Sequence, residues 1–432
     1  MTAPDRRAGR RVVITGMGAL TALGPDVDST WAAILRGRSG VRQIRQFPSD
    51  DFPVRIGSEV DLDDLPLDGV DDALRPFVTR SVRLGSWAVR EAWRDAGLDS
   101  AAHDPWRTGL IVGASNFPVI EEDDEQFWPT DALRGDSYKD QYLRICQQMP
   151  ELLDQRQIGM VSTLLADPYP VRGPCMTVQS ACASATQAIG EAYQMVREGQ
   201  VDLMVAGGAD SMLSAVCVTG FTLLSAASSY QGDPARACRP FDRDRDGLVL
   251  GEGAGIVVVE ELGHALRRGH HIHAEIVGYG SSCDGYRFTD SHPEGLGAIR
   301  CMRAALDDGG LEPGEVDYIN AHGTSTPQND RVETLAIKQV FGPRAYEIPV
   351  SSTKSQIGHL LCAAGGIELV VTVLALRDGI APPTINYETP DPDCDLDVVP
   401  GAPRPVPMRT ALSNSFGFGG QNAALIVRRW AA

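Results

Sequence analysis

The sequence predicts an α/β protein built from two similar halves. Short β-branched runs alternate with segments of helical periodicity, and the same succession of strand, glycine turn and helix begins twice along the chain. The 432 residues correspond to roughly two to three domains of ordinary size, which is ample for a large buried core. We expect the two halves to span residues 1–265 and 266–432.

The first half is expected to alternate strands with helices. Each expected strand is a short β-branched or apolar run, and each helix repeats apolar residues every three or four positions until a glycine ends it. In chain order we expect a strand at Arg11–Thr15, a helix at Ser81–Ala96, a strand at Thr108–Gly113, a helix at Ala185–Val196, and strands at Val201–Gly207 and Gly255–Glu260.

The second half repeats this order. Its opening strand, Ile272–Gly280, ends in glycines as the first strand of the chain does. After it we expect a helix at Ala298–Asp307, a strand at Val316–Ile319, an extended segment at Pro349–Ser352, a helix from about Gln356 to Leu376, and two closing segments at Leu412–Phe418 and Ala423–Val427.

The composition excludes several classes of protein. Lys and Arg number 39 and Asp and Glu number 57, so the formal net charge of −18 argues against nucleic acid as the main partner. The apolar run after the basic N-terminus is too short for a signal peptide, and the longest candidate membrane segment, Gly365–Leu376, is interrupted by Glu368. Nine cysteines without CxxC spacing indicate a reduced, cytoplasmic protein without structural zinc.

Two segments read as additions to this core. Residues 121–156 begin with EEDDE and continue as an acidic, aromatic stretch with weak helical periodicity around 142–153. We interpret this stretch as a solvated insertion that covers the core, with a partner or substrate contact as the alternative. Residues 229–247 are rich in Asp, Arg and Pro, which is typical of a surface loop.

The sequence contains patterns that are similar to known motifs but incomplete. DRDRDG at Asp242–Gly247 begins like a calcium loop, but the twelfth position is a glycine where a bidentate Glu is needed. GMGALT resembles a dinucleotide fingerprint, but Thr21 occupies the position of the third glycine. No GxSxG elbow occurs. The cluster of His270, His271 and His273 has no further metal ligand at standard spacing, so we expect surface residues near a helix end.

A candidate nucleophile lies in VQSACASATQ. Cys182 follows a strand-like stretch and opens the alanine-rich helix, where the positive end of the helix dipole favours the thiolate. The small residues around Cys182 leave room for a substrate. The alternative is a buried cysteine that packs as a small hydrophobic residue.

Two further segments carry candidate proton donors. His322 lies in NAHGTSTPQND, directly after an expected strand, where a histidine can donate a hydrogen bond or move a proton. SSTKSQIGHLLCAAGGIE contains Lys354 and His359 among small residues, and a lysine in that setting needs a partner, for which Glu368 is the candidate. A cysteine combined with distant histidines is a recognised arrangement for covalent catalysis, but the spacing alone names no reaction.

These three segments, together with RPFDRDRDGLVLGEGAG and NSFGFGGQN, resemble the β-ketoacyl-acyl carrier protein synthases. The similarity extends from about Arg11 to Arg429, and it is strongest to the elongating enzymes of dissociated fatty acid synthesis and to type II polyketide ketosynthases. It implies a thiolase-like fold, in which two duplicated α/β halves form a layered αβαβα sandwich, and assembly as a dimer.

The resemblance also implies a reaction without metal or organic cofactor. Cys182 would accept an acyl chain from the phosphopantetheine of an acyl carrier protein. His322 and His359 would stabilise the enolate formed as malonyl-carrier protein loses carbon dioxide, and the carbanion would attack the acyl-cysteine. The backbone amides of Cys182 and Phe418 would form the oxyanion hole, and Phe418 would also be the gate residue. Lys354 is expected to be a fourth catalytic residue that holds the histidine geometry together with Glu368. The expected supporting residues are Glu368, Asp330, Phe418 and Gly419.

Several points stay open at this level. Ala183, Ser184 and Ala185 replace a Thr-Ser-Gly run that the family often has. The alternatives are an active subunit paired with a cysteine-less chain-length factor, a non-catalytic subunit, and a thiolase that uses coenzyme A. Acyl chain length, pathway and dimer type do not follow from the sequence. Candidate carrier-protein docking residues are Arg75, Arg80 and Arg83.

Overall fold

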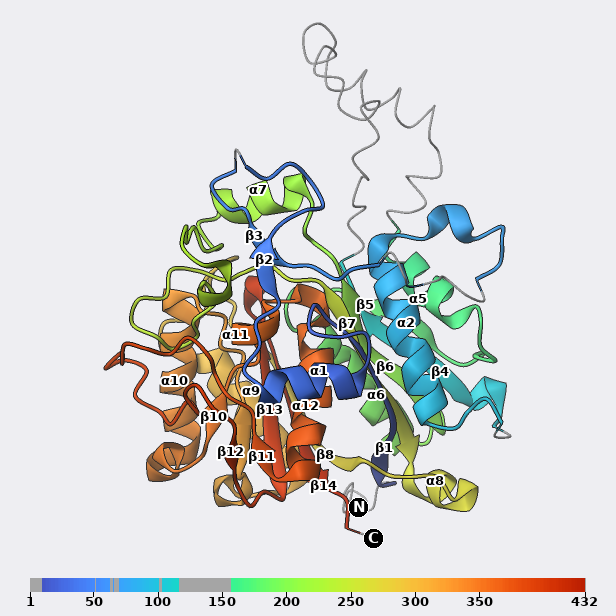
Figure 1. Cartoon of the computed structure of the whole chain (residues 1–432). Helices are drawn as coiled ribbons and strands as arrows, with labels where there is room; N and C mark the ends of the chain where they lie inside the picture. Colours follow the sequence, from blue (N-terminus) through green and yellow to red (C-terminus); the bar gives the residue numbers. More distant parts are fainter. Residues whose placement is uncertain are drawn as a thin grey trace, which may run out of the picture.

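A computed structural model describes residues 10–50, 52–62, 65, 70–100, 103–115 and 157–431 (Figure 1). The acidic, aromatic insertion expected at residues 121–156 lies outside the described residues. Among the described residues, no helix is both long enough and apolar enough to cross a membrane.

The strands repeat one order twice. The first half contributes β1 (Val12–Leu20), β4 (Thr108–Gly113), β5 (Cys175–Val178), β6 (Leu203–Asp210) and β7 (Gly253–Glu261), arranged β1-β7-β6-β4-β5. The second half contributes β8 (Ala274–Cys283), β9 (Tyr318–Asn320), β10 (Val350–Ser351), β13 (Thr410–Phe416) and β14 (Gln421–Arg429), arranged β8-β14-β13-β9-β10. In both halves the first strand lies beside the last strand, and the second and third strands form a parallel edge. The expected duplication is therefore confirmed, and the exact division at residue 265 stays a prediction.

The two halves meet where β1 and β8 pair antiparallel, Val12–Ile14 against residues 274–276. Helices then build the layers around the sheet. On the outer faces lie α2 (Arg80–Asp95) and α5 (Gly159–Ala166) for the first half, and α9 (Leu296–Gly309) with α10 (Pro327–Phe341) for the second. Between them, α6 (Ser184–Arg197) and α12 (Ala364–Asp378) contact strands of both halves.

The remaining elements are short and lie around these layers. They are α1 (Val27–Leu35), α7 (Ala215–Leu223), α8 (Leu262–Arg268), β2 (Val41–Gln43), β3 (Ile56–Ser58), β11 (Ile380–Ala381) and β12 (Arg404–Pro405). The middle helix α12 is buried on all sides from Ala364 to Leu376. An all-round apolar helix of this kind is stable only inside a protein, so α12 forms the centre of the layered α/β sandwich.

Paired glycines explain the close approach of helix to strand in each half. A Cβ atom at Gly18 in β1 would lie 2.0 Å from the carbonyl oxygen of Ala88 in α2. A Cβ atom at Gly280 in β8 would lie 2.1 Å from the carbonyl oxygen of Cys301 in α9. The glycines of the GMG sequence in β1 therefore let α2 pack closely against the strand. Gly280 in β8 has the same role for α9 in the second half.

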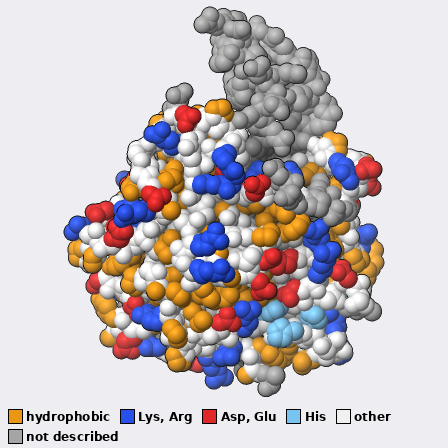
Figure 2. All heavy atoms as spheres, in the orientation of Figure 1, with side chains coloured by type: hydrophobic (Ala, Val, Ile, Leu, Met, Phe, Trp, Pro, Cys, Tyr) orange, Lys and Arg blue, Asp and Glu red, His pale blue; other side chains and the backbone are white. Residues whose placement is uncertain are grey.

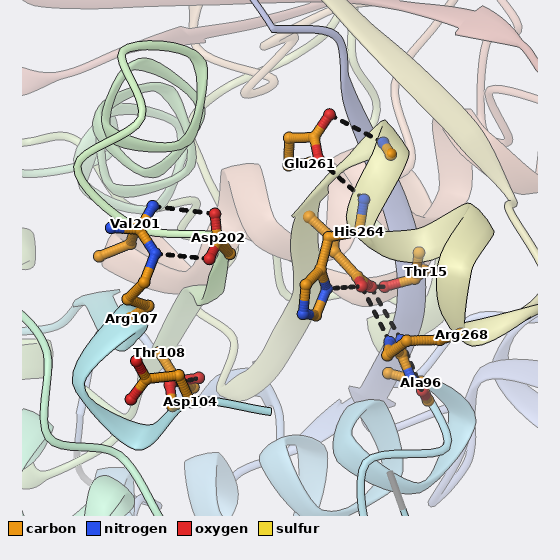
Figure 3. A network of polar contacts seen from close by, with 12 residues as sticks. Thr15, Ala96, Asp104, Arg107, Thr108, Val201, Asp202, Glu261, His264 and Arg268 are labelled. Atoms are coloured by element: carbon orange, nitrogen blue, oxygen red, sulfur yellow. Dashed lines mark hydrogen bonds and ion pairs between the residues drawn. The ribbon is translucent and has the colours of Figure 1, made fainter. Parts of the chain in front are cut away.

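A buried carboxylate ties the first half together at one end. Glu260 in β7 accepts hydrogen bonds from Thr15 at 2.7 Å and from Arg268 at 2.8 Å, and it contacts His264. Figure 3 labels these three partners, whose dashed lines converge on one unlabelled carboxylate. Burial alone would raise the pKa of Glu260, but these three donors hold it at about 2. The network fixes α8 against β1 and β7.

The expected helix from Gln356 to Leu376 is wrong, because the chain breaks between two shorter helices. The short helix α11 (Lys354–Ile357) ends at Gly358, whose φ of +67° lies in the left-handed region. The backbone N–H of His359 then donates to Val249 at 2.7 Å instead of continuing the helix. This break holds His359 outside α12.

The expected surface loop at residues 229–247 is wrong for its second part, because Phe241, Asp242 and Arg245 are buried. Asp242 accepts hydrogen bonds from the backbone N–H groups of Glu388 and Thr389, both at 2.6 Å. The acidic pattern that imitates a calcium loop thus binds a neighbouring segment of the chain.

Candidate active site

Cys182 lies in a strained turn between β5 and α6. The preceding residue, Ala181, has a φ of +50°, which is uncommon for a residue with a side chain. Ser184, the first residue of α6, stabilises the turn, because its hydroxyl accepts from Ser180 N–H at 2.9 Å and donates to the Ala181 carbonyl at 2.6 Å. The turn therefore presents Cys182 two residues before the helix.

The structure brings the three candidate reactive residues together. The Cys182 sulfur and ring nitrogens of His322 and His359 lie within 4.8 Å of one another, and all three residues are buried. The two imidazole rings meet edge to face, with centroids 5.2 Å apart. They line a pocket of about 280 Å³ whose other walls include Phe416 and Phe418. Cys182 comes from the first half of the chain and both histidines from the second.

Hydrogen bonding fixes the tautomer of His359. The backbone N–H of Leu361 donates to Nδ1 of His359 at 3.1 Å. Because Nδ1 accepts, the proton of the neutral ring must lie on Nε2. Nε2 is buried and has no partner among the described residues, so it is a free N–H donor in the Cys182 pocket.

His322 is fixed by a buried ion pair. The Lys354 ammonium contacts Nδ1 of His322 at 3.3 Å and the His322 carbonyl at 2.6 Å. The same ammonium contacts Glu368, as expected from the sequence, and both charged side chains are buried. Since Lys354 donates to Nδ1, the proton of His322 also lies on Nε2.

The turn after β13 closes the other side of Cys182. The backbone N–H of Phe418 donates to the Cys182 sulfur. A Cβ atom at Gly417 would lie 3.1 Å from the backbone nitrogen of Cys182, so the two turns touch through their backbones. Gly419 has a φ of +82° and donates to the Phe288 carbonyl at 2.6 Å.

Burial controls the protonation of the three residues. It raises the pKa of Cys182 to about 11, although Lys354 and the Phe418 N–H lower it. The expected thiolate character is therefore wrong for the unloaded site, because desolvation outweighs the charge of Lys354 and the Phe418 N–H. Burial, and then the charge of Lys354, hold the pKa values of His322 and His359 well below 6.5. At neutral pH the site thus contains a thiol and two neutral imidazoles.

These histidine pKa values predict a pH-dependent stability. Below pH 6.5 the two histidines are protonated in the unfolded chain but stay neutral in the folded site. The unfolded state therefore binds more protons, and the free energy of unfolding falls as the pH falls. His359→Asn removes one such group. Between about pH 6.5 and 5.5, wild type should lose up to about 1.4 kcal/mol more stability than the variant.

Urea unfolding of both proteins at the two pH values measures this difference. Glu333, whose pKa burial raises to about 7, acts with the opposite sign but equally in both proteins. Identical pH slopes in the two proteins would contradict the neutral state of His359.

Asp330 and the three candidate docking arginines lie outside the pocket wall. Asp330 is buried and accepts from Phe241 N–H at 2.7 Å, so it joins the His322 loop to residues 239–247 without contacting the thiol. Arg80 donates to Glu252 at 2.7 Å, which commits its guanidinium to an internal carboxylate and makes it a poor docking residue. Arg75 pairs with Asp72, and Arg83 reaches the carbonyl of Leu62.

Two buried acids beside the site were missed by sequence reasoning. Glu333 accepts from the backbone N–H groups of His322 and Gly323, both at 2.8 Å. Asp210, at the end of β6, accepts from Cys362 N–H at 3.0 Å, three residues beyond His359. The sequence could have indicated a buried role for Glu333 through its position on the apolar face of α10, because a carboxylate there needs buried hydrogen-bond partners.

A larger pocket of about 500 Å³ lies on the face shown in Figure 2, where basic, acidic and histidine side chains intermingle. It is lined by residues such as Trp87, Glu91 and His273 and shares no residue with the Cys182 pocket. Of the expected surface histidines, His270 and His273 bind Asp95, and His271 is exposed.

Sequence comparison identifies the family. The profile of the "Beta-ketoacyl synthase, N-terminal domain" matches residues 9–265, and that of the C-terminal domain matches residues 273–388. The chain belongs to the β-ketoacyl synthase family. Curated relatives named 3-oxoacyl-[acyl-carrier-protein] synthase 2 include one from Coxiella burnetii, 42% identical over 97% of this chain and 99% of its own length. Another, from Synechocystis sp., is 41% identical over 98% of both chains.

Solved structures agree on the fold. A type II polyketide ketosynthase complex with its acyl carrier protein, bound to the hexaketide, superimposes with a TM-score of 0.87 and 33% identity. The ishigamide ketosynthase/chain length factor gives 0.86 and 35%. Each comparison covers 98% of this chain and 100% of the other. The thiolase-like fold expected from the sequence is thus confirmed.

Proposed function

We propose that this chain condenses an acyl thioester with malonyl-acyl carrier protein, releasing carbon dioxide and a β-ketoacyl product that is two carbons longer. One observation carries the proposal. Two neutral histidines, each with its Nδ1 occupied, direct Nε2–H donors to the pocket of one buried thiol. Such a pair can bind a developing enolate oxygen without first losing a proton.

The first step loads the enzyme. The Cys182 sulfur attacks the acyl carbonyl, a new thioester bond forms, and the pantetheine thiol leaves with the proton that Cys182 gives up. The N–H of Phe418 already reaches the Cys182 sulfur. Together with the N–H of Cys182 it can donate to the oxygen of the tetrahedral intermediate.

The second step uses the histidines. The malonyl thioester oxygen accepts from Nε2–H of His322 and of His359, and the bond to the carboxylate breaks. Carbon dioxide leaves, its bonding electrons form the enolate, and the enolate carbon attacks the acyl-cysteine. The Cys182 sulfur departs as a thiolate and takes up a proton from solvent water. Because the departing carboxylate supplies the electron pair, we propose that no metal or organic cofactor takes part.

Lys354 and Glu368 act as positioning residues in this proposal. Lys354 donates to Nδ1 of His322, which keeps the proton on the nitrogen that faces the substrate. Glu368 balances the charge of Lys354 in a buried site. A histidine with the other tautomer would present a lone pair to the enolate oxygen and repel it.

A dimer is the proposed assembly, either of two copies or with a homologous chain-length subunit. Among the described residues, β5 is an edge strand of the sheet, and its Cys175 and Met176 are exposed. An open edge offers backbone hydrogen bonds to a second chain. Relatives named 3-oxoacyl-[acyl-carrier-protein] synthase and a type II polyketide ketosynthase leave the pathway open. We place the reaction in the reducing cytoplasm, because the described cysteines are free thiols.

Reconstitution tests the proposal. Purified chain with acyl- and malonyl-carrier protein, alone and with a homologous partner subunit, should release carbon dioxide and form a β-ketoacyl product detectable by mass spectrometry. Absence of condensation in both mixtures would overturn it. Condensation of acetyl-coenzyme A without malonyl would assign the chain to thiolase chemistry instead.

A further inference from the structure

The turn that follows His359 repeats the turn that carries Cys182. Cys362 lies two residues before α12, as Cys182 lies two residues before α6. The residues that precede these two cysteines have nearly equal left-handed backbones, with φ of +50° at Ala181 and +49° at Leu361. Each half of the duplicated fold therefore supplies one strained turn. The second turn binds His359, because the Leu361 N–H donates to Nδ1 of that ring.

The second turn is anchored by Asp210 at the end of β6. One carboxylate oxygen, Oδ2, accepts from the Cys362 N–H at 3.0 Å. The other oxygen, Oδ1, accepts from the Ser115 hydroxyl and from the Ser211 N–H, the latter at 3.0 Å. The Cys362 thiol donates to the same carboxylate. Asp210 therefore joins the turn before α12 to a strand of the other half of the fold.

The surroundings of Asp210 fit its charged form. The side chain is fully buried, and burial raises its pKa, whereas the four hydrogen bonds lower it. Each of these four groups supplies a hydrogen, so a neutral carboxylic acid would turn its own proton toward a donor. A buried carboxylate is costly unless its oxygens are hydrogen-bonded. The turn at Cys362 provides two of the four bonds that meet this cost.

Two successive backbone amides connect Asp210 to His359. The N–H of Leu361 donates to Nδ1 of His359 at 3.1 Å, and the next N–H, that of Cys362, donates to Asp210. A left-handed leucine is strained and persists only where its surroundings hold it. Strand β6 also supports the turn at Gly208, where a Cβ atom would lie 2.7 Å from the Cys362 carbonyl oxygen. Without its acceptor, the turn can relax and withdraw the Leu361 N–H from the imidazole.

We propose that Asp210 is a positioning residue for condensation: it holds the turn at Leu361 and Cys362, and this turn keeps the proton of His359 on Nε2. Asp210 does not line the Cys182 pocket, so it acts through the backbone and not on the substrate. The catalytic consequence rests on the proposed function, because it is the enolate oxygen that needs the Nε2–H donor. The tautomer itself is a property of the resting enzyme.

The first test reads the tautomer directly. In the full-length chain with ¹⁵N-labelled histidine, NMR shows which ring nitrogen of His359 carries the proton, and His359→Asn assigns its signals. Wild type and Ser115→Ala should show the proton on Nε2 only, because the Cys362 N–H keeps its acceptor. Asp210→Ala should show a second form with the proton on Nδ1. Asp210→Asn, whose side-chain oxygen can still accept, should lie between these results.

The second test separates the two half-reactions. Acylation of Cys182, followed by intact-protein mass spectrometry, does not use His359, whereas release of carbon dioxide from malonyl-carrier protein does. Asp210→Ala should lower the rate of carbon dioxide release by at least about tenfold, as for loss of one hydrogen bond to a charged group. It should not lower the acylation rate, because the charge of Asp210 raises the pKa of the Cys182 thiol.

Two results would overturn the inference. One is an unchanged His359 spectrum in Asp210→Ala, and the other is an equal loss of both half-reactions, which would show that Asp210 acts only through the fold. If Asp210→Ala does not fold, Asp210→Asn gives the same comparison with a smaller change. A wild type that neither acylates nor decarboxylates would overturn the proposed function, while the NMR measurement would still decide the role of Asp210.

Discussion

Replacing Cys182 with alanine should lower kcat/KM for condensation by at least about 1,000-fold, because no other group can hold the acyl chain in the pocket. The variant should fold normally, since removing one sulfur from a turn flanked by small residues leaves a small cavity. Intact-protein mass spectrometry should show an acyl adduct on wild type and none on the variant.

Cys301→Ala is the matched control for the loss of a thiol. Cys301 is fully buried in the second half and does not line the pocket. Its variant should keep the acyl adduct and most of the activity. An adduct that persists in Cys182→Ala, or that disappears in Cys301→Ala, would contradict the assignment of the nucleophile.

Replacing Lys354 with methionine should lower the free energy of unfolding by about 3–5 kcal/mol, because Glu368 then stays buried without its partner. Condensation should fall by at least about 100-fold, since His322 loses the donor that fixes its tautomer. Chemical unfolding and steady-state kinetics measure the two effects separately.

The double variant Lys354→Met with Glu368→Leu separates stability from positioning. Replacing a buried ion pair with apolar residues of similar size is often neutral or stabilising, so the double variant should regain most of the lost stability. Its activity should stay low, because neither new side chain can donate to His322. Recovery of activity together with stability would show that Lys354 acts only through the fold.

Local sequence was enough to single out the candidate reactive residues, and the family resemblance then implied their roles. Cys182, His322 and His359 each lie in a segment rich in small residues, which leaves room for a substrate but does not by itself exclude a structural role. The partner of Lys354 was also predictable, because a buried ammonium without a counter-charge is too costly. These inferences depend on short stretches of chain and on general energetic rules.

What failed depends on contacts between distant segments. The break at Gly358 is invisible in an apolar sequence of helical appearance, because it is the backbone of Val249 that binds His359. The high pKa of Cys182 follows from burial, which the helix-end argument does not include. Asp210 and Glu333 read as ordinary acids until the fold places backbone N–H groups against them.

The shared middle layer of α6 and α12 has a consequence for biosynthesis. The ribosome completes α6 at Arg197, but α12 ends only at Asp378. At about 5–20 residues per second, roughly 10–40 s pass before α12 emerges to cover the apolar side of α6. The nascent first half is therefore exposed to aggregation throughout this interval, and production of the protein should depend on chaperones that bind incomplete chains.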